Sequence, residues 1–312
     1  MIHSCDEAES SRAKNNQSTS PEVPRLGGVC YREFVDEYVR PNKPVIITDA
    51  IDHWPAMRRW TPDFFRDEYG SMDVEMDGLT MSQFIDKVEQ SAAGSADNLP
   101  YFRNRSIHQT FPELAPDISP LPIYLQPNWF NNQLVPKRIS RHRTDIFIGG
   151  VGSRFPYLHW DNYHGYAFLF QIYGEKTYIL YPPEQSPFLY PKADGRLLAN
   201  VCSIEDIENP DAGRFPLFAR ATPTRCVLGH GEMMFMPSGW WHTARMDTPS
   251  ISVSSNTANA YNWSALMCDH WQNVTKHPLK AMVGAVYLRM IWLMESSKDL
   301  LYRNRKLLRA HS

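Results

Sequence analysis

Three side chains of metal-ligand type lie in two short stretches of this 312-residue sequence. His159 and Asp161 are separated by one residue, and in an extended segment residues two apart point to the same side. The imidazole and the carboxylate would therefore lie next to each other. His242 follows later, after a Gly-Glu turn, an apolar run and two tryptophans. Two histidines and one carboxylate are the ligand set of iron(II) sites that keep positions open for a co-substrate and O2. We predict that His159, Asp161 and His242 form such a site.

A buried cation is expected beside this site. Lys176 follows Gly174 and Glu175 and opens the apolar segment TYILYPP, which is typical of a strand. An ammonium group inside a barrel is costly unless it meets an anion. A carboxylated co-substrate that chelates the metal at one end would supply this anion at its other end.

Each of these features has a plainer structural interpretation when it is taken alone. A single His is more often a hydrogen-bonded structural residue than a metal ligand, so the prediction depends on the ordered combination of motifs. The neighbouring Trp240 and Trp241 are interpreted as packing at the mouth of the site rather than as a stacking surface for a substrate. His164 and His230 are interpreted as loop residues.

The elements that must position the site are short strands in the middle of the chain and helices at its ends. Strands are predicted at residues 45–48, 72–76, 145–151, 166–173, 177–181, 226–228, 233–236 and 251–254. The fourth and fifth would form a hairpin across Gly174, and residues 229–232 would join the sixth and seventh as another strand pair. Helices are predicted at residues 31–39, 61–69, 80–90, 263–271 and 281–295, with Thr61 and Thr80 as caps. This order favours one mainly β barrel with flanking N- and C-terminal helices.

Composition narrows the class of protein. The net charge is −2 and the pI is about 6.6, so no global field favours nucleic acid or an anionic membrane. The five cysteines are scattered without paired spacing, which favours a reducing compartment, the cytoplasm or a nucleus. Residues 279–294 are apolar but too short for a membrane span and are interrupted by charge. Residues 1–22 are expected to be a disordered tail. The basic run at residues 137–143 is either a solvated loop or a patch that faces an acidic or phosphate-bearing substrate.

Taken together, the motifs resemble those of the JmjC-type, cupin-like Fe(II)- and 2-oxoglutarate-dependent oxygenases. The resemblance rests on HWD at residues 159–161, GEKTYILYPP at 174–183 and GEMMFMPSGWWHTA at 231–244. The entry segment at residues 41–60 and EQSPFLYP at 184–191 are also similar. Within the family, the chain is most similar to the small hydroxylase-like members, such as the asparaginyl hydroxylase of hypoxia-inducible factor and the heat-shock-protein-27-associated protein. The resemblance covers residues 24–259 and implies a double-stranded β-helix, also called a jelly-roll or cupin barrel.

The resemblance also implies roles for individual residues. His159, Asp161 and His242 match the iron ligands, and Lys176 matches the residue that pairs with the far carboxylate of 2-oxoglutarate. Tyr124 resembles a tyrosine that binds the same carboxylate, and Ser254 occupies a position near the co-substrate. Two positions depart from the family pattern: Ala167 replaces an Asn nine residues before the Lys, and Pro156 replaces a Thr three residues before the first His. The co-substrate pocket would then obtain its polar groups from other residues, and Tyr163, Tyr178 or Asn256 would supply them.

The expected activity is the hydroxylation of a protein or peptide side chain with Fe(II), 2-oxoglutarate and O2, giving succinate and CO2. Three alternatives remain open: demethylation of N-methyl lysine or arginine, oxygenation of tRNA or a small metabolite, and a cupin that holds metal without turnover. We expect a catalytic domain at residues 23–262 and a C-terminal helical extension at 263–312. By resemblance, this extension would pair two copies into a homodimer.

Overall fold

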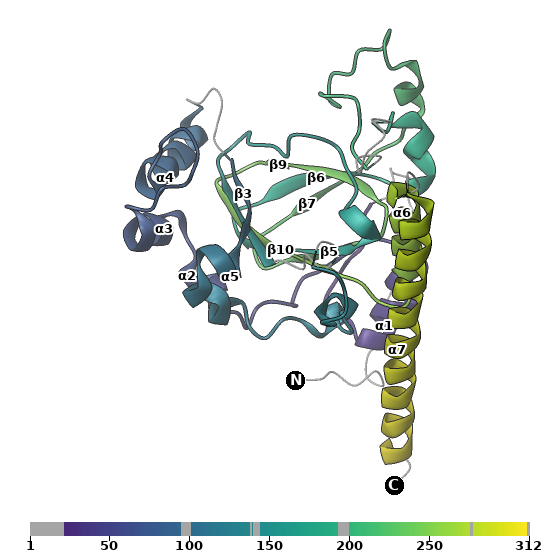
Figure 1. Ribbon diagram of the computed structural model, residues 1–312. Coiled ribbons are helices and arrows are strands. Elements are labelled where there is room, and N and C mark those ends of the chain that lie inside the picture. The colour runs from purple at the N-terminus through teal and green to yellow at the C-terminus, as the bar shows by residue number, and fades with distance from the viewer. Residues whose placement is uncertain are drawn as a thin grey trace, which may run out of the picture.

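The computed structural model describes residues 22–94, 101–137, 139, 144–192, 200–274 and 277–310. Two β-sheets lie one above the other at its centre, and helices flank them on both sides (Figure 1). The β-branched and aromatic runs in the middle of the chain form these sheets, as their strand propensity predicts. The expected tail at residues 1–22 lies outside the described residues except for its last residue.

The larger sheet has seven strands in the order β1-β2-β8-β5-β10-β4-β3. Its pairs are antiparallel except for β1 with β2. The strands are β1 (Arg25–Leu26), β2 (Val45–Ile47), β3 (Tyr101–Ser106), β4 (Thr144–Gly149), β5 (Tyr166–Tyr173), β8 (Met233–Met236) and β10 (Ser250–Thr257).

The two faces of this sheet differ in composition, because successive side chains along each strand point to opposite faces. In β10, Ile251 and Val253 join the main hydrophobic core beneath the N-terminal helices. Ser252, Ser254 and Asn256 of the same strand line a cavity between the sheets. The alternating sequence of β10 thus provides one apolar face for stability and one polar face for a site.

The smaller sheet has three strands in the order β7-β6-β9, with β6 (Lys176–Tyr181), β7 (Thr224–Leu228) and β9 (Trp241–Met246). The predicted hairpin across Gly174 is wrong, because β5 belongs to the larger sheet, whereas β6 pairs with β7 and β9 in the smaller one. The expected pairing of residues 226–228 with 233–236 is wrong for the same reason, since β7 and β8 lie in different sheets. A tight turn requires the chain to reverse direction, but it does not require the two strands to pair. Both turns carry the chain from one sheet to the other.

The N-terminal helices pack on the larger sheet. They are α1 (Tyr31–Phe34), continued by the π-helical turn η2 (Val35–Val39), and α2 (Ala56–Arg59), α3 (Pro62–Tyr69), α4 (Met81–Gln90) and α5 (Ile107–Thr110). The predicted caps are confirmed: the Thr61 hydroxyl accepts a hydrogen bond from the backbone N–H of Phe64, and Thr80 forms a capping box with Gln83. The predicted strand at residues 72–76 is wrong. Glu75 and Asp77 have φ angles of 55° and 51°, and these left-handed residues turn the chain.

Irregular segments between these elements form short 3-10 helices. They are η3 (Ser91–Ala93), η4 (Pro112–Ile118), η5 (Ile123–Leu125), η6 (Trp129–Asn131), η7 (Asn162–His164), η8 (Pro183–Phe188) and η9 (Pro216–Arg220).

Two helices form the C-terminal side of the molecule: α6 (Trp263–Val274) and the long α7 (Pro278–Ala310) (Figure 1). Gly284 allows them to approach closely, because a Cβ atom there would lie 2.2 Å from Nε2 of His270. Trp263 and Leu288 join a core cluster with η6. Among the described residues, no helix combines the length and the apolarity that crossing a membrane requires.

The fold is therefore mixed α and β rather than mainly β, since the flanking helices contain more residues than the central strands. The two facing sheets and the helices at both ends agree with the predicted arrangement. The sequence pattern underestimated the helices because it did not reveal the full length of α7. The exact division into domains at residues 22, 262 and 312 stays a prediction.

Candidate metal centre

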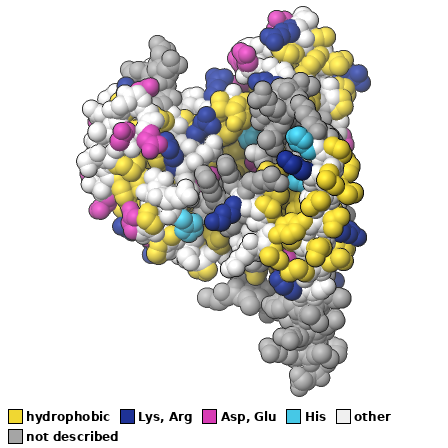
Figure 2. Space-filling view, in the orientation of Figure 1, with side chains coloured by type: hydrophobic (Ala, Val, Ile, Leu, Met, Phe, Trp, Pro, Cys, Tyr) yellow, Lys and Arg dark blue, Asp and Glu magenta, His cyan; other side chains and the backbone are white. Residues whose placement is uncertain are grey.

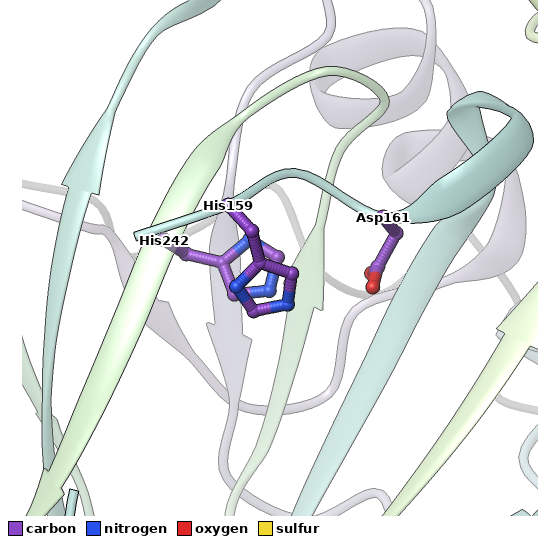
Figure 3. Close-up of side chains that lie close together, drawn as sticks. All are labelled: His159, Asp161 and His242. Atoms are coloured by element: carbon purple, nitrogen blue, oxygen red, sulfur yellow. The ribbon is translucent and has the colours of Figure 1, made fainter. Parts of the chain in front are cut away.

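His159 and His242 come together because their backbones pair directly. The N–H of His242 donates to the carbonyl of His159 at 2.7 Å, and the N–H of His159 donates to the carbonyl of His242 at 3.1 Å. This antiparallel bridge joins the extended segment before η7 to the first residues of β9. The two imidazole ring centroids are 4.4 Å apart as a result. Two residues separated by more than eighty positions in the chain thus present their rings to the same space (Figure 3).

Asp161 completes the group from the same extended segment as His159. Ligand atoms of the three side chains lie within 4.8 Å of one another (Figure 3). The structure thus brings together all three residues that the sequence predicted as ligands. The amide of Asn256, from β10, donates to Oδ2 of Asp161 at 3.3 Å and to the carbonyl of Tyr166 at 3.3 Å. Asn256 therefore contacts the carboxylate directly.

The donor set fits a metal ion. Nδ1 of His242 lies 3.0 Å from the carbonyl of Trp240, and because a carbonyl only accepts, Nδ1 donates this hydrogen bond and Nε2 is the ring nitrogen left to bind a metal. Nδ1 of His159 is buried and has no hydrogen-bond partner among the described residues, which is unfavourable unless a further group binds there. Two imidazoles and one carboxylate suit iron(II).

Burial changes the protonation of the site in a consistent direction. Desolvation, reinforced by the charge of His242, lowers the pKa of His159 well below its usual value. Desolvation also raises the pKa of Asp161, although His242 and the Asn256 hydrogen bond oppose the shift. The site thus favours the neutral imidazole that a metal requires. The carboxylate is a costly charge that a cation would stabilise.

The cavity around these ligands has a volume of about 110 Å³, and the buried Lys176 lines it. Lys176 opens β6 and is only 2% exposed. Its Nζ donates to the hydroxyl of Ser252 at 2.5 Å, across the space between the two sheets. Burial lowers the pKa of Lys176 from 10.5 to about 7, because desolvation disfavours the charged form. This ammonium is therefore poised to accept an anionic ligand.

Aromatic rings surround this end of the cavity. Nζ of Lys176 lies 5.8 Å from the ring centroid of Tyr101 in β3 and 5.5 Å from that of Phe147 in β4. At the metal end, Phe155 stacks on the ring of His159 with centroids 4.4 Å apart. These rings limit access of water and stabilise the cation through their π faces.

The other predicted residues divide into two groups. Ser254 and Asn256 line the cavity together with Ala167 and Tyr178. Tyr124 does not line it: its hydroxyl donates to the carbonyl of Val29, and its ring packs on Phe34 in the main core. The structure places Tyr101 near Lys176, where the sequence suggested Tyr124. Alternation in β3 was the available signal, but the pairing of β3 with β4 depends on tertiary structure.

The remaining candidates are located outside the cavity or only partly described. Tyr163 packs in the cluster with α6 and α7. The indole N–H of Trp240 donates to the carbonyl of Asn42, and that of Trp241 donates to the hydroxyl of Ser186, in agreement with the predicted packing role. Most of the basic run at residues 137–143 lies outside the described residues.

Comparisons with known proteins agree with this site. The family model described as a cupin-like domain matches residues 31–78 and 72–266. A Xenopus tropicalis protein named lysine-specific demethylase 8 is 29% identical over 245 residues, which cover 74% of this chain and 52% of that protein. An arginine-specific demethylase of Arabidopsis thaliana is 26% identical over 290 residues, which cover 80% of this chain and 61% of that protein.

A human protein named as a bifunctional peptidase and (3S)-lysyl hydroxylase is 26% identical over 263 residues, which cover 71% of this chain and 79% of that protein. The chain thus spans between about half and three fifths of the length of the two demethylases and a larger share of the hydroxylase. The predicted likeness to the small hydroxylase-like subgroup in particular stays a prediction.

Proposed function

This chain belongs to the cupin-like domain family, and we propose that it is an Fe(II)- and 2-oxoglutarate-dependent oxygenase that hydroxylates a protein or peptide side chain. The observation that carries the proposal is the placement of His159, Asp161 and His242 in one cavity with the buried Lys176. A fold of this kind can carry many activities, so the proposal depends on these residues. The human lysyl hydroxylase among the relatives supports the choice of a protein side chain.

Iron(II) with bound 2-oxoglutarate would supply oxygen activation at a substrate C–H bond, with succinate and CO2 as co-products. His159, Asp161 and His242 would hold the metal. The backbone bridge between the two histidines fixes the spacing of their rings before any metal binds. The carboxylate of Asp161 would offset part of the metal charge. Three protein ligands leave positions free for the co-substrate and O2.

Lys176 and Ser252 would bind the far carboxylate of 2-oxoglutarate. Their hydrogen bond already fixes the ammonium at the end of the cavity, so little reorganisation is needed for binding. The rings of Tyr101 and Phe147 would shield this contact from water, and an ion pair is stronger in such surroundings than at an exposed surface. Lys176 thus orients the co-substrate toward the metal.

Demethylation is the second candidate, because relatives from Xenopus tropicalis and Arabidopsis thaliana are named as lysine- and arginine-specific demethylases. The same site serves both reactions. Hydroxylation of an N-methyl carbon gives a hemiaminal that releases formaldehyde, whereas hydroxylation of a C–H bond in the side-chain skeleton is retained. Product mass separates the two: the gain of one oxygen atom indicates hydroxylation, and the loss of a methylene unit indicates demethylation.

The test is succinate formation by the purified protein with Fe(II), 2-oxoglutarate and a pool of peptides, followed by mass spectrometry of those peptides. We expect succinate and an oxygen-containing peptide with the wild type, and neither with Asp161→Ala. Asp86→Ala, which removes an exposed carboxylate of α4, is the matched control and should retain activity. A wild type that binds metal without affinity for 2-oxoglutarate would overturn the proposal in favour of a metal-holding cupin.

We also propose that α7 pairs two copies of the chain. Its exposed face carries large apolar residues at helical spacing, and hydrophobic side chains gather on this side of the molecule (Figure 2). Ala281, Leu288 and Ile291 of the same helix are buried against the body. The exposed residues are Leu279, Met282, Val283, Val286, Met290 and Leu293, each more than half exposed. A contiguous exposed apolar surface of this kind usually contacts another protein.

The pairing is tested by sedimentation of the full chain at micromolar concentration. The wild type should sediment as a dimer, and a double substitution of Val286 and Met290 by Glu should yield a monomer with unchanged helicity. Lys280→Glu, on the same helix, is the charge-changing control and should leave the dimer intact. A monomeric wild type would contradict the proposal.

A further inference from the structure

Asn256 contacts the metal-binding carboxylate from a different strand, and its own backbone is fixed. The amide group of Asn256 reaches Oδ2 of Asp161 at 3.3 Å. Its carbonyl accepts a hydrogen bond from the side chain of Asn128 at 3.2 Å. The side-chain oxygen Oδ1 of Asn128 in turn accepts from the backbone N–H groups of Phe130 and Ala258. The amide that meets Asp161 is thus held at the end of β10 by the loop around η6.

Asp161 needs such a contact because its own backbone is irregular on one side. The residues after it form η7, where Tyr163 and His164 have φ angles of 58° and 51°. Left-handed backbone at two consecutive residues other than glycine persists only where the surroundings fix it. Among the described residues, Asn256 is the donor to the Asp161 side chain. A carboxylate with one oxygen bound in this way has a defined orientation, and the other oxygen can face a metal.

Position 167, on the paired strand β5, is a second position from which a side-chain amide could reach Asp161. Asn256 pairs with Ala167 in the register of β10 and β5, and both residues line the cavity. Side chains that face each other across an antiparallel pair have Cβ atoms about 5 Å apart. The small Ala167 side chain therefore faces the cavity beside Asn256. An asparagine at position 167 would direct its amide toward the same carboxylate from the neighbouring strand.

We propose that Asn256 is a positioning residue that orients Asp161 for metal binding. Of the two facing positions 167 and 256, it is position 256 on β10 that supplies the amide, while position 167 on β5 carries an alanine. The inference rests on the proposed function only in taking the three-residue group as a metal centre. It assigns to Asn256 a role toward the carboxylate ligand instead of the direct co-substrate contact that the sequence suggested. Mutation of a residue that hydrogen-bonds a metal ligand typically weakens metal affinity 10–100-fold, so we expect an effect of about that size when Asn256 is replaced.

The experiment measures Co(II) binding by the visible absorption of the bound ion, with the full chain and in the absence of 2-oxoglutarate. Asn256→Ala should weaken Co(II) binding by about 10–100-fold. The double variant Asn256→Ala with Ala167→Asn should recover most of this loss. Ser255→Ala, at the residue before Asn256 in β10 and outside the cavity lining, is the control and should bind as the wild type does. Asn256→Leu keeps the side-chain volume without a donor, so it replaces Asn256→Ala if the latter does not fold.

Each outcome has a distinct meaning. Weaker binding in Asn256→Ala, with recovery in the double variant, supports the proposal, since a purely structural role would not be restored from another strand. Binding equal to that of Ser255→Ala overturns the positioning role. A loss without recovery overturns the equivalence of positions 167 and 256. A wild type that binds no Co(II) overturns the metal centre itself, and therefore fails at the proposed function rather than at Asn256.

Discussion

Binding of 2-oxoglutarate should take up a proton, and Lys176 is the group that should accept it. Burial lowers the pKa of Lys176 to about 7. A bound carboxylate would raise this pKa again, toward the ordinary value of about 10.4 for lysine. At about pH 8 only about one tenth of the free protein carries a proton on Lys176, so binding should take up about 0.9 proton. At about pH 6 the ammonium is already formed, and the uptake should fall to about 0.1 proton.

Titration calorimetry in buffers of different ionisation enthalpy measures this uptake directly. The protein is loaded with Co(II) and kept free of oxygen, so that binding is observed without turnover. Lys176→Arg is the control: its guanidinium stays charged, so any residual binding should show no linked uptake. Binding by the wild type at about pH 8 without proton uptake would refute the argument. Equal uptake by the Arg variant would assign the proton to another group of the cavity.

Two further predictions concern stability, and both are measured by denaturant unfolding of the metal-free protein. The pKa of Lys176 is about 7 in the folded state and 10.5 ordinarily, so the unfolded state binds more protons between these two pH values. The free energy of unfolding should therefore rise with pH across this window, by up to about 5 kcal/mol. Lys176→Met should remove this rise and should increase stability at neutral pH. Gly174→Ala should cost roughly 2–4 kcal/mol, because φ is +67° there and a Cβ atom would lie 2.0 Å from the carbonyl of Pro249. Gly78→Ala, with φ of +68° and open space around the new methyl, should cost only about 1–2 kcal/mol. A flat pH profile would contradict the first prediction, and equal costs at the two glycines would contradict the second.

The local signals in the sequence were reliable where a single interaction determines the structure. Thr61 and Thr80 cap helices because a hydroxyl beside a free N–H group is a local arrangement. His159 and Asp161 point to the same cavity because alternation in an extended chain is also local. The strand predicted at residues 72–76 is wrong, because the chain turns there at left-handed residues other than glycine, which the sequence does not signal.

Long-range pairing accounts for the errors in the site and the fold. The turn at Gly174 was recognised, but the transfer of the chain from the larger to the smaller sheet was not, because a turn does not specify hydrogen-bond partners. The resemblance suggested Tyr124 as the tyrosine near Lys176, but which tyrosine lies there depends on the pairing of β3 with β4, which places Tyr101 at that position.

The sequence by itself determined the chemistry available to this protein: the ligand types at 159, 161 and 242, the single lysine that accompanies them, and the motif order of the family. The spacing of residues along an extended chain and the chemistry of each side chain are properties of short segments, so they can be read without a fold. Only the tertiary structure decided which groups surround those ligands. It placed Ser252 and Tyr101 beside Lys176, and Asn256 on Asp161, because contacts between strands distant in sequence depend on how the two sheets pack.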